Sequence, residues 1–135
     1  RDYTGGHYRL SLLVREITEG MEDPSGRPSE RFTTVKAGMI KIATSKYLTP
    51  LERRANTAAG LASLQTGCPI TLHTTDGGGL ELAQLLLSLK VPPPKIIVGH
   101  QGYKDDRENV KATDYHRKLA ELGLWVQFDR IGSDN

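Results

Sequence analysis

The stretch AGMIKIAT, residues 37–44, decides the fold of this 135-residue chain. It is short, rich in β-branched residues and preceded by a polar segment, a pattern that predicts a buried β-strand. A lysine inside such a strand loses its hydration, and the loss is costly unless another interaction compensates for it. Lys41 therefore either extends its amine to a solvated end of the strand or puts its nitrogen to chemical use.

A helical pattern precedes this strand, and helical and extended patterns alternate after it. We predict helices over Leu10–Met21, Pro50–Gln65, Leu80–Leu89 and Val110–Leu122, and further strands over Pro69–His73, Lys95–Gly99 and Leu124–Asp129. A helix, three strand–helix units and a final strand imply parallel strands joined by helical crossovers. An open doubly wound sheet fits this order, and so does part of a (β/α)8 barrel, which four strands alone cannot close. Residues 1–135 would then be one incomplete domain.

The composition excludes several classes of protein. The chain is 37% hydrophobic and 25% charged, which argues against disorder. Its net charge is +2 and it has no basic stripe interleaved with aromatic residues, so nucleic acid is not an expected partner. No membrane span or signal peptide is recognisable, and the cytoplasm is favoured, although the single Cys68 leaves the compartment open. The first residue, Arg1, suggests a processed or truncated chain.

A polar residue lies at or near the end of every predicted strand: Lys41, His73, His100 and Asp129. They are spaced by about one strand–helix unit, so all four are expected at the carboxyl edge of the sheet, where parallel α/β folds place their active sites. A lone histidine at a strand end is more often structural than a ligand, and a lone lysine or aspartate has equally ordinary explanations. Four such residues in register favour a common site.

Four stretches resemble the phosphotriesterase family of the amidohydrolase superfamily: AGMIKIAT, TGCPITLHT, KIIVGHQG and VQFDRIG. The resemblance extends over residues 12–131 and implies a fragment of a (β/α)8 barrel, approximately strands four to seven with their helices. It also implies that Lys41, carboxylated by carbon dioxide, bridges two divalent metal ions, and that His73 and His100 bind one of them. Zinc is the expected metal, with cobalt, manganese or iron as alternatives.

Asp129 and Arg130 point to the substrate side of such a site. An arginine after this aspartate resembles the lactonase-like members, and both residues would line the substrate pocket. The implied reaction is attack of a metal-bridging hydroxide on a lactone or an organophosphate triester. The expected partner is a small-molecule ester or lactone, and the whole protein is a candidate homodimer.

The chain also departs from the family pattern. It lacks the His-x-His pair of the first strand and the aspartate of the last strand, so we expect the chain alone to be inactive. A non-catalytic, incomplete paralogue that acts as a binding or structural piece is the main alternative. An open flavodoxin-like domain that binds an anion at its loops is a third interpretation.

Overall fold

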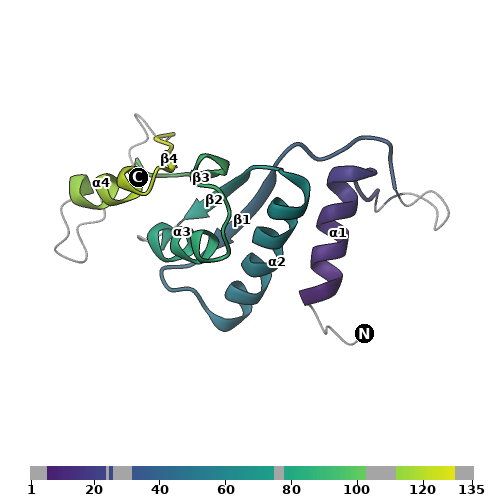
Figure 1. Ribbon diagram of the computed structural model, residues 1–135, viewed down its shortest axis with the longest axis horizontal. Coiled ribbons are helices and arrows are strands. Elements are labelled where there is room, and N and C mark those ends of the chain that lie inside the picture. Colours follow the sequence, from purple (N-terminus) through teal and green to yellow (C-terminus); the bar gives the residue numbers. More distant parts are fainter. Residues whose placement is uncertain (1–5, 24, 26–31, 75–77, 103–111, 130–135) are drawn as a thin grey trace.

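The computed structural model describes residues 6–23, 25, 32–74, 78–102 and 112–129. Its helices and strands follow the predicted order (Figure 1). They are α1 (Gly6–Thr18), β1 (Ile40–Thr44), α2 (Pro50–Thr66), β2 (Ile70–Thr74), α3 (Gly79–Ser88), a 3-10 helix (Pro93–Lys95), β3 (Ile96–Val98), α4 (Ala112–Glu121) and β4 (Trp125–Val126). No described helix is both long enough and apolar enough to cross a membrane.

The ends of α1 and β4 differ clearly from the prediction, and so do the starts of α1, at Gly6 instead of Leu10, and of β1, at Ile40 instead of Ala37. Helix α1 ends at Thr18 because Met21 pairs with a later segment: its backbone N–H donates to Val35, and its carbonyl accepts from Thr33. Strand β4 is limited to Trp125–Val126, although Leu124–Asp129 was predicted. The ends of α1 and β4 depend on backbone partners from other parts of the chain, which the pattern of neighbouring residues does not reveal. The predicted helix start at Val110 lies outside the described residues.

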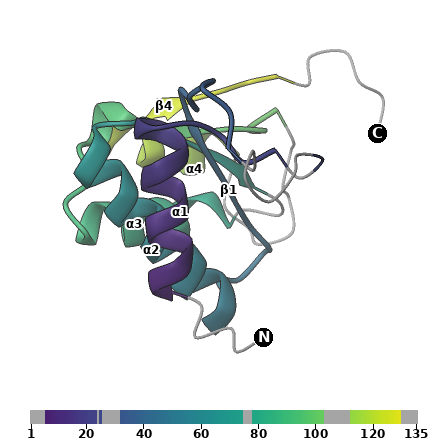
Figure 2. The ribbon, with the colours of Figure 1, turned by 90° about the vertical axis from the view of Figure 1, so that its right-hand side faces the viewer.

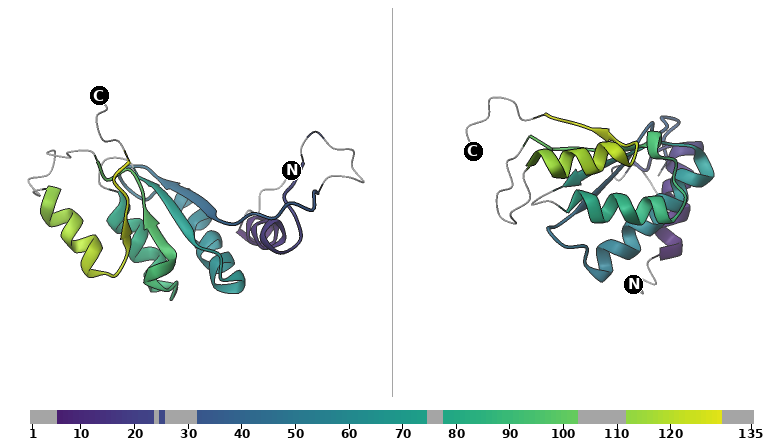
Figure 3. Two further views of the ribbon diagram at one scale, coloured as in Figure 1. Left: turned by 90° about the horizontal axis from the view of Figure 1, so that it is seen from above. Right: turned by 60° about the vertical axis from the view of Figure 1, so that its left-hand side comes forward.

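The four strands form one parallel sheet in the order β1-β2-β3-β4, so each strand pairs with the next one along the chain. All four helices lie on one face of this sheet, and no described helix covers the other face (Figure 3). A doubly wound sheet has helices on both faces and a reversal of strand order, neither of which is present among the described elements. The chain therefore forms an arc of a (β/α)8 barrel, and the open-sheet alternative is wrong.

The hydrophobic core lies between the sheet and its helices. Helix α1 packs beside α2, so the helical layer continues past the edge strand β1 (Figures 1 and 2). The most deeply buried large side chains come from β2, β3, the segment after α3, and helices α3 and α4: Ile70, Leu72, Ile96, Val98, Val91, Leu82, Leu86 and Leu119. Because alternate strand residues supply this core, the remaining strand residues face away from the helices.

Strand β1 is buried on one face only, which corrects the expectation of a buried strand. Ile40 is 2% exposed, whereas Met39 is 46% exposed and Lys41 and Ala43 are also exposed. The exposed residues lie on the face that no described element covers. The predicted desolvation of Lys41 is therefore absent from the described part of the chain.

Both ends of α2 are capped as the sequence predicts. Thr49 and Glu52 form a capping box, and Ser45 adds two more donors to the Glu52 carboxylate. Hydrogen bonds from the side chain and backbone of Thr49, followed by those from Ser45, lower the pKa of Glu52 from 4.5 to about 2. At the other end Gly67 is left-handed, with φ 71°, and its N–H donates to the carbonyl of Ser63.

Candidate metal centre

His73 lies near the carboxyl end of β2 on the face turned away from the helices. In the parallel register Ala43 is opposite His73 and Lys41 is opposite Thr71. Paired residues of parallel strands point to the same face, and so do residues two apart along one strand. His73 and Lys41 therefore share the uncovered face of the sheet.

His100 follows β3 and does not obey the alternation of that strand. By sequence parity it belongs with Ile96 and Val98, both of which are buried toward the helices. However, β3 ends at Val98, and His100 has a left-handed backbone with φ 61°. Its ring lies against that of His73 instead, with ring centroids 4.5 Å apart and the planes at 76°. A left-handed backbone at a non-glycine residue costs roughly 1–2 kcal/mol, so surrounding contacts must hold it.

Asp129, from the segment after β4, reaches the same place. Its Oδ2 atom lies 2.8 Å from Nδ1 of His100, and the two side chains are 24% and 20% exposed respectively. Nδ1 is buried and forms no hydrogen bond with a described residue, so its contact with Asp129 is a close approach of the two atoms without hydrogen-bond geometry. A carboxylate beside one ring nitrogen favours the tautomer that carries its proton there, which leaves Nε2 as a lone-pair donor.

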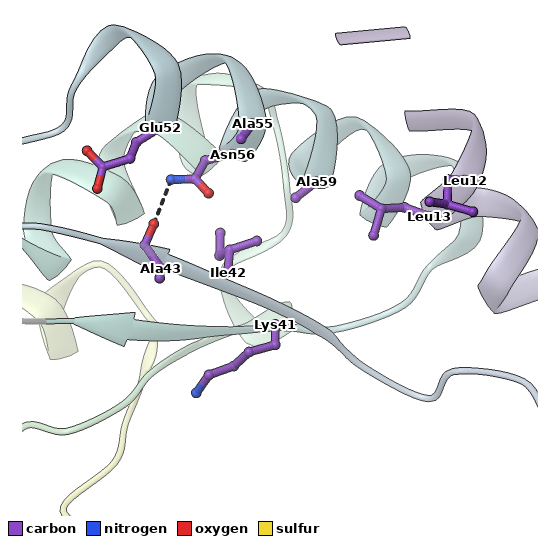
Figure 4. A pocket seen from close by; sticks show the side chains of 9 residues that line it. All are labelled: Leu12, Leu13, Lys41, Ile42, Ala43, Glu52, Ala55, Asn56 and Ala59. Carbon is purple, nitrogen blue, oxygen red and sulfur yellow. Dashed lines mark hydrogen bonds between the residues drawn. The ribbon is translucent and has the colours of Figure 1, made fainter. Parts of the chain in front are cut away.

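Lys41 projects from the uncovered face of β1. Figure 4 shows its amine leaning toward the carboxyl end of the strand, away from α2. On the opposite side, the Asn56 amide of α2 donates to the carbonyl of Ala43 at 3.0 Å. A hollow of about 420 Å³ is lined by residues of α1, α2 and β1, Lys41 among them, but it includes neither histidine. We therefore place the candidate site at the histidines and not in this hollow.

The residues at this edge fit part of a ligand set for divalent metals. Two imidazoles lie in ring contact, one of them has an orienting carboxylate, and a lysine shares their face. Imidazole nitrogen and carboxylate or carbamate oxygen suit zinc and similar ions. Within the described ranges, no three His, Cys, Asp or Glu side chains gather closely enough to hold an ion by themselves. The described residues are therefore compatible with part of a ligand set but do not complete one.

One group of polar residues at this edge was not predicted. Thr74 and Gln101, the residues that follow His73 and His100, are 6% and 5% exposed and are joined by a hydrogen bond. The sequence feature that could have identified this pair is a residue with a hydrogen-bonding side chain directly after each predicted histidine ligand. Arg130 lies outside the described residues, so its predicted place beside Asp129 remains a prediction. His116 of α4 lies outside this group and packs its ring against Phe128, with ring centroids 4.9 Å apart.

Comparison with known proteins supports this interpretation of the fold. A sequence model described as "Phosphotriesterase family" matches residues 9–135. The chain is 38% identical over 126 residues to the phosphotriesterase homology protein of Escherichia coli, covering 91% of this chain and 38% of the relative. It is 33% identical over 123 residues to the phospho-furanose lactonase of Mycoplasmopsis agalactiae, covering 89% of this chain and 33% of the relative.

A solved structure leads to the same family. It comes from the molecular engineering of organophosphate hydrolysis activity from a weak promiscuous lactonase template, and it superposes with a TM-score of 0.75 at 35% identity. The match covers 94% of this chain and 35% of that structure, so the chain spans about a third of the length of these relatives. The match over nearly all of this chain, in sequence and in backbone, shows that it belongs to the phosphotriesterase family.

Proposed function

We propose that this chain provides one side of the two-metal site of a hydrolase that cleaves ester-type substrates. The observation that carries the proposal is the meeting of His73 and His100 at the carboxyl edge of the sheet, with Asp129 beside His100. These three side chains come from segments that are far apart in the sequence. Their convergence at the edge where barrel enzymes keep their active sites favours a functional role over three separate structural roles.

Each residue has a distinct task in this proposal. His73 and His100 hold one metal ion through ring nitrogens, and Asp129 keeps His100 in the required tautomer and orientation. Lys41, as a carbamate formed with carbon dioxide, supplies anionic oxygens that bridge this ion and a second one. When bound, the two ions, zinc in the first instance, activate water and polarise the substrate oxygen. The remaining ligands would come from outside the part of the barrel described here.

Two observations support the proposed substrate class: the names of the relatives and one further residue. The matched proteins include a phospho-furanose lactonase and a structure engineered for organophosphate hydrolysis from a weak promiscuous lactonase template. Arg130 directly follows Asp129 in the sequence, as in the lactonase type that the chain resembles. We therefore propose a lactone as the preferred substrate and an organophosphate triester as a weaker one.

Zinc or cobalt binding to the 135-residue chain tests the metal half of the proposal. Titration calorimetry and the visible spectrum of Co²⁺ are expected to show one weak site that His73→Ala and His100→Ala each abolish. His116→Ala is the matched control, because His116 packs on Phe128 and takes no part in the proposed site. Equal loss of binding in all three variants, or loss in none, would contradict the assignment.

Hydrolysis of a lactone and of paraoxon tests the catalytic half. The chain alone is expected to be nearly inactive even with added zinc, because it holds only part of the ligand set. In the complete barrel, Lys41→Arg is expected to lose both metals, since guanidinium stays protonated and cannot be carboxylated. Lys41→Glu is expected to keep partial metal content. A fully active Lys41→Arg variant would exclude the bridging role and favour a non-catalytic alternative.

A further inference from the structure

His100 has a backbone conformation that its own sequence does not favour. It is left-handed, and glycine normally occupies such a position. Without this turn the alternation of β3 would direct the His100 side chain to the helical face, with Ile96 and Val98. The contact between His100 and His73 therefore depends on whatever holds the turn.

A buried hydrogen-bond network surrounds this turn. The Gln101 side-chain amide donates to Oγ1 of Thr74 at 2.7 Å and to the carbonyl of Gly99 at 2.7 Å. Thr74 Oγ1 donates in turn to the same carbonyl at 2.8 Å. Both amide hydrogens and the hydroxyl are thus used, and the carbonyl just before His100 accepts from two directions.

The same segment is tied to the next strand through the backbone. The Gln101 N–H donates to the Gln127 carbonyl at 3.0 Å, and the Gln127 N–H donates to the Val98 carbonyl at 2.9 Å. The peptide units on both sides of His100 are therefore held by groups on β2 and on the segment after β4. An unsatisfied amide buried to this degree is costly, so the network strongly favours one conformation.

We propose that Gln101, acting with Thr74, is a positioning residue that holds His100 against His73. The arrangement of Gln101 and Thr74 is given by the contacts just described, whereas their effect on metal binding rests on the proposed function. Glutamine suits this task because it places two N–H donors at the end of a side chain long enough to reach both acceptors. Methionine has a similar length and no donor, so Gln101→Met removes the hydrogen bonds with little change in volume.

Two substitutions separate positioning from a general loss of stability. In Gln101→Met and in Thr74→Val we expect the nuclear Overhauser contact between the His73 and His100 rings to disappear from the metal-free chain. We also expect zinc affinity to fall at least tenfold, as is typical when a group that orients a metal ligand is removed. Thr74→Ser keeps the hydroxyl and is expected to retain the ring contact and to stay within about threefold of the parent affinity.

Ser63→Ala is the matched control. It removes another buried hydrogen bond, from Ser63 to the carbonyl of Cys68 at 2.6 Å, at the opposite edge of the sheet. We expect it to lower stability while leaving the ring contact and zinc affinity unchanged. A Gln101→Met or Thr74→Val chain that keeps the ring contact would overturn the proposal.

The two proposals fail in different ways. If the ring contact disappears in the variants but the parent chain binds no zinc through His100, the positioning role stands and the proposed function fails. If zinc binds through His100 and is unaffected by Gln101→Met and Thr74→Val, the metal site stands and the positioning role is refuted. Should Gln101→Met not fold, Thr74→Val and its serine counterpart provide the same test.

Discussion

Replacing Asp129 with asparagine tests the proposed centre most directly. The change keeps the size of the side chain and removes its charge, so the atom 2.8 Å from Nδ1 of His100 is no longer a carboxylate oxygen. An amide also presents either an oxygen or an NH2 group to the ring, and the latter favours the opposite tautomer. We therefore expect the His100 ring to be less firmly oriented and the tautomer with a lone pair on Nε2 to be less populated.

The size of the effect follows from the burial of the pair. Removing a group that orients a metal-ligating histidine typically weakens metal affinity by roughly 10- to 100-fold. With side chains 20% and 24% exposed and no hydrogen bond at Nδ1, the His100–Asp129 contact belongs in the lower part of that range. A loss of roughly 10- to 30-fold corresponds to about 1.4–2 kcal/mol.

Calorimetric titration of the 135-residue chain with zinc measures this change, and long-range ¹H–¹⁵N spectra of the metal-free chain report which nitrogen of His100 carries the proton. Asp114→Asn is the charge-matched control, because Asp114 pairs with Arg117 on the exposed surface of α4. Zinc affinity of Asp129→Asn within twofold of the parent, with the His100 tautomer unchanged, would refute the reasoning.

Three further predictions concern the scaffold. Leu72 is 0% exposed in the central part of the sheet, so Leu72→Ala should lower the free energy of unfolding in urea by about 2–5 kcal/mol. Leu64 is 41% exposed, so Leu64→Ala should lower it far less. Equal losses in the two variants would contradict the assigned core. Gly67→Ala places an alanine in a left-handed conformation and should lower the free energy of unfolding by about 1 kcal/mol, although no atom lies near the added methyl group. An unchanged melting temperature would contradict this prediction. The Glu52 carboxylate has a lowered pKa, so its stabilising contribution should be complete above about pH 4.5 and disappear as the pH falls to about 2. The stability difference between the parent and Glu52→Gln should follow that course, and a difference that persists at pH 2 would exclude the ionised cap as its cause.

Local signals in the sequence were sufficient for the order of elements and for the caps of α2. Thr49, Glu52 and Gly67 were assigned correctly because capping chemistry acts between residues only a few positions apart. The apolar periodicity likewise identified every α-helix and β-strand among the described residues, but not the 3-10 helix Pro93–Lys95, since the sheet and its α-helices need one apolar face each. The spacing of about one strand–helix unit also predicted correctly that His73, His100 and Asp129 lie at one edge of the sheet.

Patterns along the chain were enough to predict that strands and helices alternate, that the strands run parallel, and that candidate ligands occur where the strands end. Only the tertiary structure decided that all helices lie on one face, which leaves Lys41 exposed, and that β4 stops at Val126. It also decided that His100 turns against the alternation of β3, because hydrogen bonds from Thr74 and Gln101 hold the peptide before it. Periodicity and capping arise from neighbours along the chain, whereas these features arise from partners on other strands, and no local pattern records which partners will meet.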